Sequence, residues 1–191
     1  MPLRVWVLLV PVGFMAAGYS IPFIKTKNGF IRLRDISWLK ALWIGLAYAW
    51  LTTFLPIAFE YSITRLMQPL VYFMFARNFL FVFAIVIPFD IRDLHYDMKN
   101  GMRTLPVILG IKGAIRLSLS LLFAFVIITL IQYVYFGFDK WISIALCFSA
   151  IETALVIPFA KPERPNLFFP LAIESSMLLQ WALVFAAVHL A

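Results

Sequence analysis

Charged residues are scarce in this sequence. Asp, Glu, Lys and Arg together make up 13% of its 191 residues, whereas a soluble domain carries about 25%. Hydrophobic residues account for 64%, and the mean hydropathy is +0.96. This composition excludes a water-soluble enzyme and a disordered chain. It indicates an integral membrane protein with several spans.

Cysteine and histidine are almost absent. Cys147 is the only cysteine, so the chain cannot form an internal disulfide, which excludes a disulfide-stabilised scaffold. Two histidines, His95 and His189, are too few to favour a zinc site. We therefore expect neither a disulfide framework nor a zinc centre.

Six apolar runs are long enough to cross a bilayer as helices, because about 20 apolar residues span the hydrocarbon core. They are Val5–Ile24, Leu39–Phe59, Leu70–Phe89, Ile115–Phe138, Trp141–Phe159 and Leu167–His189. The start of the sequence also fits a signal peptide, but its apolar run continues to Ile24 and is long enough to span. Since no repeat, linker or β-barrel alternation is visible, we expect residues 1–191 to form one all-α transmembrane bundle of six helices.

The basic residues predict how these spans are oriented. Twelve of the 16 Lys and Arg fall in or beside the connections after the first, third and fifth spans. Arg4, Arg65 and Lys140 lie on the other side, and Arg77 lies inside the third span. Because cytoplasmic loops are rich in Lys and Arg, this bias predicts that these connections are cytoplasmic and that both termini are outside. We expect the membrane to be a bacterial inner membrane. The net charge of +7 then reflects topology, and no nucleic-acid partner is expected.

Three of the nine acidic residues follow the third span within eight positions. If the third helix continues beyond the membrane, Asp90, Asp93 and Asp97 share one face of it. Carboxylates this close repel one another unless a cation lies between them, and Mg²⁺ combines one or two carboxylates with phosphate oxygens. Lys99 and Arg103 follow and can hold the same phosphate, and Gly101 between them lets the chain turn back. The alternative is a solvated polar loop of mixed charge.

The run DIRDLHYDMKNGMRTLPVILG, residues 90–110, resembles the second aspartate-rich motif of the UbiA-type membrane prenyltransferases. The matching positions are Asp90, Asp93, Asp97, Lys99, Gly101, Arg103, Thr104, Leu109 and Gly110. The segments Tyr19–Pro22 and Arg32–Asp35 resemble the family more loosely. The similarity covers most of the chain and favours the diphosphate site over the solvated loop.

The resemblance implies a nine-helix bundle that holds a prenyl diphosphate through Mg²⁺ between two aspartate-rich motifs. Such a protein transfers the prenyl group to a hydrophobic, usually aromatic acceptor, as in quinone biosynthesis. By this analogy Asp93 and Asp97 are catalytic and hold Mg²⁺, and Asp90 supports them as a further metal-site residue. Lys99 and Arg103 would bind the diphosphate as it departs.

The first motif of that family, N-x-x-x-D-x-x-x-D, does not occur in the sequence. Six spans with the N-terminus outside correspond to helices four to nine of the family. The sequence is then an N-terminally incomplete member, for which a separate N-terminal half chain would be a partner, or a member that has lost the first metal half-site. Two alternatives remain open: a non-catalytic relic that binds an isoprenoid lipid or a partner, and a small membrane transporter.

Polar residues inside the spans form a second group of candidates. Arg77 and Glu152 are charges within apolar runs, and such residues usually face the interior of a bundle, where these two can pair. Polar groups also follow one face of the last span, from Glu174, Ser175 and Ser176 to Gln180. They either line a cavity and orient the acceptor or form hydrogen bonds between helices.

Overall fold

The computed structural model describes residues 3–22, 24–26, 29–31, 36–60 and 63–190. These residues form a bundle of helices, which confirms the expected all-α class. Its elements are α1 (Leu3–Ser20), β1 (Ile24–Thr26), β2 (Gly29–Ile31), α2 (Ser37–Glu60), α3 (Ile63–Leu66), α4 (Pro69–Arg92), α5 (Leu94–Lys99), α6 (Leu105–Phe136), α7 (Lys140–Val156) and α8 (Ser175–Leu190). A 3-10 turn, η2 (Ile157–Phe159), ends α7, and a π-helical turn, η3 (Phe169–Glu174), leads into α8.

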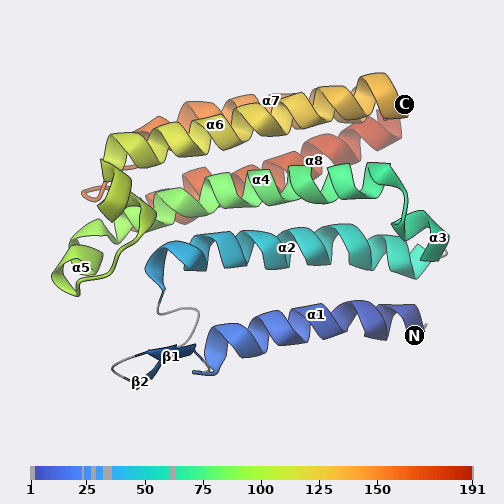
Figure 1. Cartoon of the computed structure of the whole chain (residues 1–191). Coiled ribbons are helices and arrows are strands. Elements are labelled where there is room, and N and C mark those ends of the chain that lie inside the picture. The colour runs from blue at the N-terminus through green and yellow to red at the C-terminus, as the bar shows by residue number, and fades with distance from the viewer. Residues whose placement is uncertain (1–2, 23, 27–28, 32–35, 61–62, 191) are drawn as a thin grey trace.

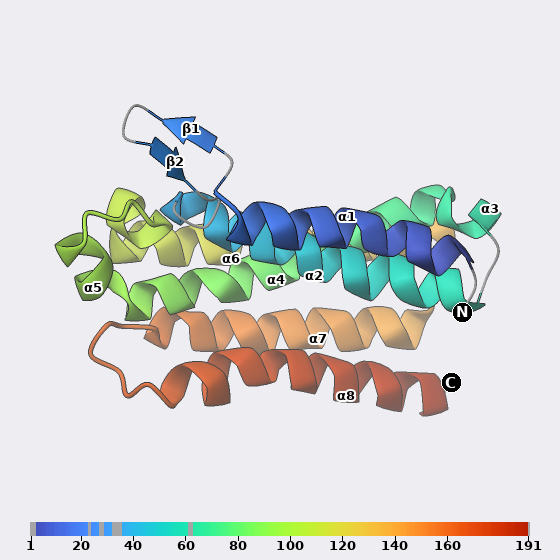
Figure 2. The same cartoon turned by 90° about the horizontal axis from the view of Figure 1, so that it is seen from below.

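The long helices run side by side along one axis (Figure 1). Helices α1, α2, α4 and α6 follow one another across the bundle, and α7 and α8 pack together on its other side (Figure 2). Helix α5, the β1–β2 hairpin and the α7–α8 connection lie at one end, called here the α5 end. Helix α3, the start of α1 and the end of α8 lie at the opposite end, called the α3 end.

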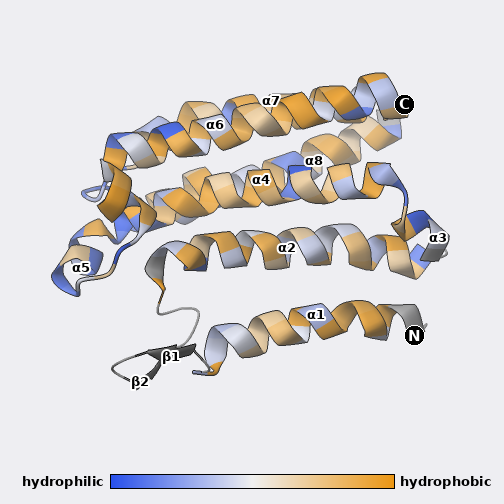
Figure 3. Cartoon of the chain, viewed as in Figure 1, coloured by the Kyte–Doolittle hydropathy of each residue, from blue (hydrophilic) through white to orange (hydrophobic). Residues whose placement is uncertain are grey.

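Within the described ranges, five helices are long and apolar enough to cross a membrane, and the apolar part of α1, Val5–Ser20, is shorter. The helices are mainly hydrophobic, whereas hydrophilic residues gather at α5 and α3 (Figure 3). The expected first span, Val5–Ile24, is too long, because α1 ends at Ser20 and Ile24 pairs with Ile31 in the hairpin. Pro22 has no amide hydrogen with which to continue the helix.

A close approach of α2 to α4 fixes the relative position of these helices. A Cβ atom on Gly45 would lie 3.2 Å from the ring of Phe79 and 3.3 Å from the Cβ of Phe83, so the glycine lets the helices touch. Ala49, one turn further along α2, is fully buried. Because the helices run antiparallel, this contact brings the start of α2 to the end of α4, where Lys40 meets Asp90.

The apolar core reaches the end of α4. The rings of Phe81 and Phe125 lie 5.3 Å apart between α4 and α6, and those of Phe89 and Phe169 lie 5.9 Å apart between α4 and η3. Ile91 in the last turn of α4 is fully buried. The segment that carries the acidic residues therefore leaves a packed part of the bundle at a fixed place.

Helix α6 starts earlier than the apolar run predicts. The sequence places the fourth span at Ile115–Phe138, but the helix begins at Leu105 and is broken at Gly110, where φ is 72° and ψ is 165°. An L side chain rarely adopts this backbone conformation. The break separates the short helical segment after Thr104 from the main part of α6, and it allows the chain to turn beside α5.

Replacing Gly110 by Ala should lower the free energy of unfolding by about 1–3 kcal/mol, because the alanine would be held in a backbone region that only glycine occupies easily. Thermal unfolding in detergent measures the effect. The control is Gly13→Ala in α1, where no heavy atom lies within 4 Å of the new Cβ. That change should be neutral or slightly stabilising. Equal unfolding temperatures for the two variants would show that the break at Gly110 is not required.

Candidate functional site

The aspartate-rich segment does not form one continuous helix. Helix α4 ends at Arg92, and Asp93 caps it with φ −88° and ψ 7° before α5 begins at Leu94. The three acidic residues therefore do not share one face of a single helix, as the sequence alone suggests. Asp90 lies in the last turn of α4, Asp93 at the junction and Asp97 in α5.

The chain then turns back at Gly101, as its sequence predicts. Gly101 has a φ of 66°, a value that favours glycine. The amide of Met102 donates to the carbonyl oxygen of Asp97 at 2.9 Å. This turn places Arg103 and the start of α6 after the acidic residues at the α5 end.

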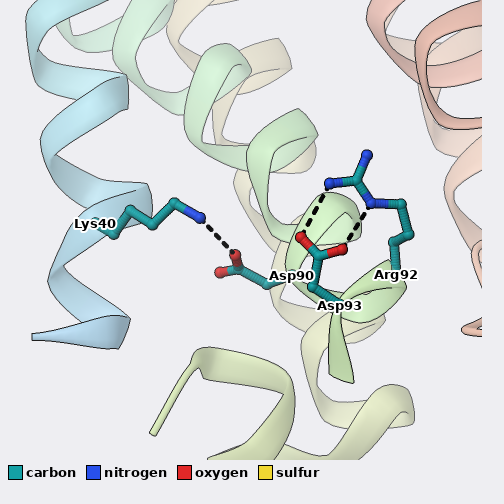
Figure 4. A network of polar contacts seen from close by, with 4 residues as sticks. All are labelled: Lys40, Asp90, Arg92 and Asp93. Atoms are coloured by element: carbon teal, nitrogen blue, oxygen red, sulfur yellow. Dashed lines mark hydrogen bonds and ion pairs between the residues drawn. The ribbon is translucent and has the colours of Figure 1, made fainter. Parts of the chain in front are cut away.

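Asp90 is buried beside a cation from another helix. Its side chain comes from α4 and points toward Lys40 of α2 (Figure 4), with Nζ 4.0 Å from Oδ1. Asp90 is 3% exposed, and its Oδ2 atom has no hydrogen-bond partner. A buried carboxylate with one long ion pair and one unsatisfied oxygen keeps capacity for another cation.

Asp93 pairs with its neighbour in the sequence. Arg92 donates from Nε to Oδ1 at 2.8 Å and from Nη2 to Oδ2 at 2.9 Å (Figure 4). The guanidinium of Arg92 also lies over the rings of Phe89 and Phe169, 5.5 and 5.8 Å from their centroids. The core aromatics thus hold Arg92, and Arg92 fixes the direction of the Asp93 carboxylate.

Asp97 is buried in the α5 segment at 6% exposure. Burial raises the pKa of its carboxyl above the ordinary value, and the negative charge of Asp93 raises it further. The nearby Thr104 side chain and Lys40 act in the opposite direction on this pKa. The Thr104 hydroxyl is buried and forms no hydrogen bond with a described residue. The charged form of Asp97 is therefore under-compensated and would gain from a cation.

Lys99 and Arg103 are the two unengaged cations of the segment. Both side chains are exposed, and neither forms an ion pair or a side-chain hydrogen bond with another described residue. They stand on either side of the Gly101 turn, after Asp97. The segment thus combines two buried carboxylates with two exposed cations that are available to an anionic ligand.

The three carboxylates gather at the α5 end, yet they do not form a ready-made metal cage. In the part of the chain that the structure describes, no group of three His, Cys, Asp or Glu side chains is close enough to hold a metal ion. The donor chemistry nevertheless fits Mg²⁺, which needs only one or two carboxylates and takes its other oxygens from water and phosphate. The unsatisfied Oδ2 of Asp90 and the raised pKa of Asp97 are the observations that support this fit.

Two residues of this site are not identified by the sequence motif. Lys40 and Arg92 are among the twelve basic residues that predict the topology, and the structure pairs them with Asp90 and Asp93. The sequence holds a signal for Lys40: antiparallel neighbouring spans bring the start of the second span and the end of the third to the same membrane face. No sequence signal identifies which of the nearby acids it meets.

The pair between Arg77 and Glu152 that the sequence permits does not form between the described residues. Among the described side chains, the guanidinium of Arg77 makes no ion pair, and its Nη1 donates to Oε1 of Gln132 at 2.8 Å. The Oε2 atom of Glu152 is buried without a hydrogen-bond partner. Arg77 therefore belongs to a separate polar group inside the bundle.

The chain matches the UbiA prenyltransferase family over residues 1–166. A curated relative is digeranylgeranylglyceryl phosphate synthase from Haloquadratum walsbyi, which is 33% identical over 77 residues. That match covers 40% of this chain and 27% of the relative, so the chain spans well under half the length of that protein. No solved structure gives a significant match. The segment Arg32–Asp35, which resembles the family loosely, lies outside the described residues. Together with the helical bundle and the Asp90–Gly110 motif, the match over residues 1–166 shows that this integral membrane protein belongs to the UbiA prenyltransferase family.

Proposed function

We propose that the α5 end of this bundle binds the diphosphate group of a prenyl diphosphate together with Mg²⁺, in a reaction that transfers the prenyl group to a hydrophobic acceptor. One observation supports it most: two kinds of group occur in the same segment. Asp90 and Asp97 are buried carboxylates whose charge is under-compensated. Lys99 and Arg103 are exposed cations without an ion pair to a described residue. Family membership supplies the reaction class.

Asp93 and Asp97 would hold Mg²⁺, and Asp90 would support them. When bound, the ion neutralises the diphosphate and stabilises the charge that develops as the diphosphate leaves. A carboxylate has about four lone-pair sites, so Asp93 can keep both contacts to Arg92 and still offer an oxygen to a cation. Lys40 offsets part of the negative charge near Asp90 and limits the repulsion among the acids.

Lys99 and Arg103 would bind the diphosphate oxygens directly. In the reaction the allylic carbon–oxygen bond breaks, and the diphosphate leaves with the bonding electrons. The acceptor then forms the new bond to the prenyl carbon and loses a proton. The positive charges of Lys99 and Arg103 stabilise the leaving group most as negative charge develops on it during bond breaking.

The acceptor would approach from the membrane. The relative from Haloquadratum walsbyi is named for a product in which prenyl groups are joined to a glyceryl phosphate. For this chain we propose only the class of acceptor, a lipid-like or aromatic molecule. The other aspartate-rich segment that the family uses for the same diphosphate does not occur in these 191 residues. A separate N-terminal half chain would be the partner that supplies it. The charge bias predicts that the α5 end faces the cytoplasm.

Metal removal tests this proposal. The chain in lipid nanodiscs should bind radiolabelled geranylgeranyl diphosphate about 10-fold or more tightly in Mg²⁺ than in EDTA, because at least one charge-assisted contact is lost with the ion. Geranylgeraniol, which has the same tail without the diphosphate, is the control and should show no such dependence. Equal diphosphate binding in Mg²⁺ and EDTA would refute the proposed site.

The release of inorganic diphosphate, measured with a membrane lipid extract as acceptor, separates a working transferase from a relic. Release that depends on the chain and on Mg²⁺ is the result expected for the transferase. Tight binding without release, even when the missing motif is supplied by an upstream segment, would identify a binding protein instead.

A further inference from the structure

A second polar site lies inside the bundle, away from the aspartate-rich segment. A cavity of about 390 Å³ is lined by α2, α4, α7 and α8. Its polar lining residues are Thr52, Arg77, Asn78 and Gln180. Arg77 lies 13 positions before Asp90 in α4, which is about 20 Å along a helix axis. The cavity is therefore separate from the proposed diphosphate site.

Arg77 is the charged residue of this cavity, and it has little compensation. Its side chain is 5% exposed, and Nη1 donates to the neutral amide oxygen of Gln132 at 2.8 Å. The guanidinium also lies 5.2 Å from the centre of the Phe138 ring. Its Nε atom is buried without a partner, and no carboxylate pairs with it in the described part of the chain. A charge within an apolar bundle is energetically costly unless it is paired, so an unpaired guanidinium favours an anionic ligand.

Neutral hydrogen-bonding groups line the same cavity. Asn78 donates from Nδ2 to Oγ1 of Thr53 at 3.0 Å, which holds its side chain against α2. Gln180 of α8 lines the opposite wall, and its carboxamide has no hydrogen bond to another described residue. Three helices therefore present polar groups to one space, and the remaining wall is apolar and aromatic, with Phe81 and Trp181.

Shape and depth restrict what can fill this space. The volume accommodates an acidic head group and the first part of a chain, but it is too small for a whole lipid. Trp181, on one wall, is 66% exposed on the outer surface of the bundle, where an apolar tail can continue into the membrane. Arg77 lies eight positions into α4, about 12 Å from the α3 end of that helix, so the head group must enter below the membrane surface.

From these observations we propose that the cavity binds the acidic head group of an amphiphile, a carboxylate or a phosphate on an apolar tail, through Arg77 and Gln180. Arg77 supplies the charge and donors in the fork geometry that matches two oxygens of such a group. Asn78 keeps the wall of α2 and α4 in place. The ligand neutralises the guanidinium and joins α4 to α8, two helices that come from distant parts of the sequence.

Native mass spectrometry of the full chain in detergent tests the proposal with four probes. Oleate and phosphatidylglycerol carry the acidic group on different molecules, and oleyl alcohol and phosphatidylcholine are their controls without net negative charge. Oleate, phosphatidylglycerol or both should bind about 10-fold or more tightly than the matched control, since a hydrogen bond to a charged group is stronger than one between neutral groups. Whichever acid binds identifies the source of the head group. Equal binding of each acid and its control would overturn the proposal.

Variants locate the binding in the cavity. Arg77→Gln should abolish the preference for the acidic probe, whereas Arg116→Gln, which removes an exposed arginine from α6, should preserve it. Gln180→Leu leaves Arg77 in place and should weaken binding of the acidic probe a few-fold. It tests whether the probe binds in the cavity if the Arg77→Gln variant does not fold. Asp97→Asn should leave binding of the same acidic probe unchanged, which separates this site from the diphosphate site. Acid binding that persists in both cavity variants would contradict the proposal.

Discussion

Replacing Asp97 or Asp93 by Asn should weaken Mg²⁺-dependent binding of geranylgeranyl diphosphate by about 10- to 100-fold, as the loss of residues that hold or orient a metal commonly does. Where the complete protein carries out prenyl transfer, the rate should fall further, by roughly 100- to 1,000-fold, because the lost interaction is strongest as charge develops on the diphosphate. Binding in nanodiscs and release of inorganic diphosphate measure the two effects.

Loss of stability would not explain this result for Asp97. Because burial raises the pKa of Asp97 in the folded protein, its charged form at neutral pH opposes folding, and a neutral isostere relieves that cost. The Asn variant should therefore unfold at the same temperature as the wild type or at a higher one. A lower unfolding temperature would indicate a structural role instead.

Asp139→Asn is the matched control. Asp139 is an exposed acid at the start of α7, where its side chain accepts from the amide of Ile142 at 2.9 Å, and asparagine is an equally good helix cap. It lies at the α3 end, far from the aspartate-rich segment, so diphosphate binding should be unchanged. Equal losses in the Asp97 and Asp139 variants would mean that the effect is not specific to the proposed metal site.

Removing both exposed cations should have a comparable effect on binding. In the double variant Lys99→Gln with Arg103→Gln, affinity for geranylgeranyl diphosphate should fall about 10-fold or more, because each lost charge-assisted hydrogen bond contributes roughly 1.5–3 kcal/mol before solvent screening. Neither residue has a protein partner among the described residues, so folding should be unaffected. The dependence of binding on salt concentration should also become shallower.

Lys161→Gln controls for the overall positive charge at the α5 end. Lys161 is exposed in the connection between α7 and α8, at the same end of the bundle. Its loss should change the affinity little, and binding of geranylgeraniol should be the same in all variants. An unchanged diphosphate affinity in the double variant would remove Lys99 and Arg103 from the site and leave only the carboxylates.

The order of acids, turn glycine and bases along residues 90–110 correctly predicts a turn that follows the acidic residues. Gly101 has the positive φ that the turn requires, and it follows α5, which carries Asp97 at the same end of the bundle as the last turn of α4 with Asp90. The expectation of a continuous helix that aligns the three carboxylates is wrong, because Asp93 ends α4 and turns its side chain to Arg92. Helix ends depend on local capping and on the packing of the preceding turn, which hydropathy does not report.

The membrane bundle itself follows from composition. A bilayer has a fixed thickness and offers no hydrogen bonds, so long apolar runs must become helices whatever their neighbours are. Which side chains meet across those helices depends on their rotation and relative height, and these are set by contacts such as Gly45 against Phe79. For that reason the sequence by itself determined the helical class, the acidic motif and the approximate positions of five of the six expected spans. Only the tertiary structure decided that Lys40 meets Asp90 and that Arg77 meets Gln132 beside a cavity instead of pairing with Glu152.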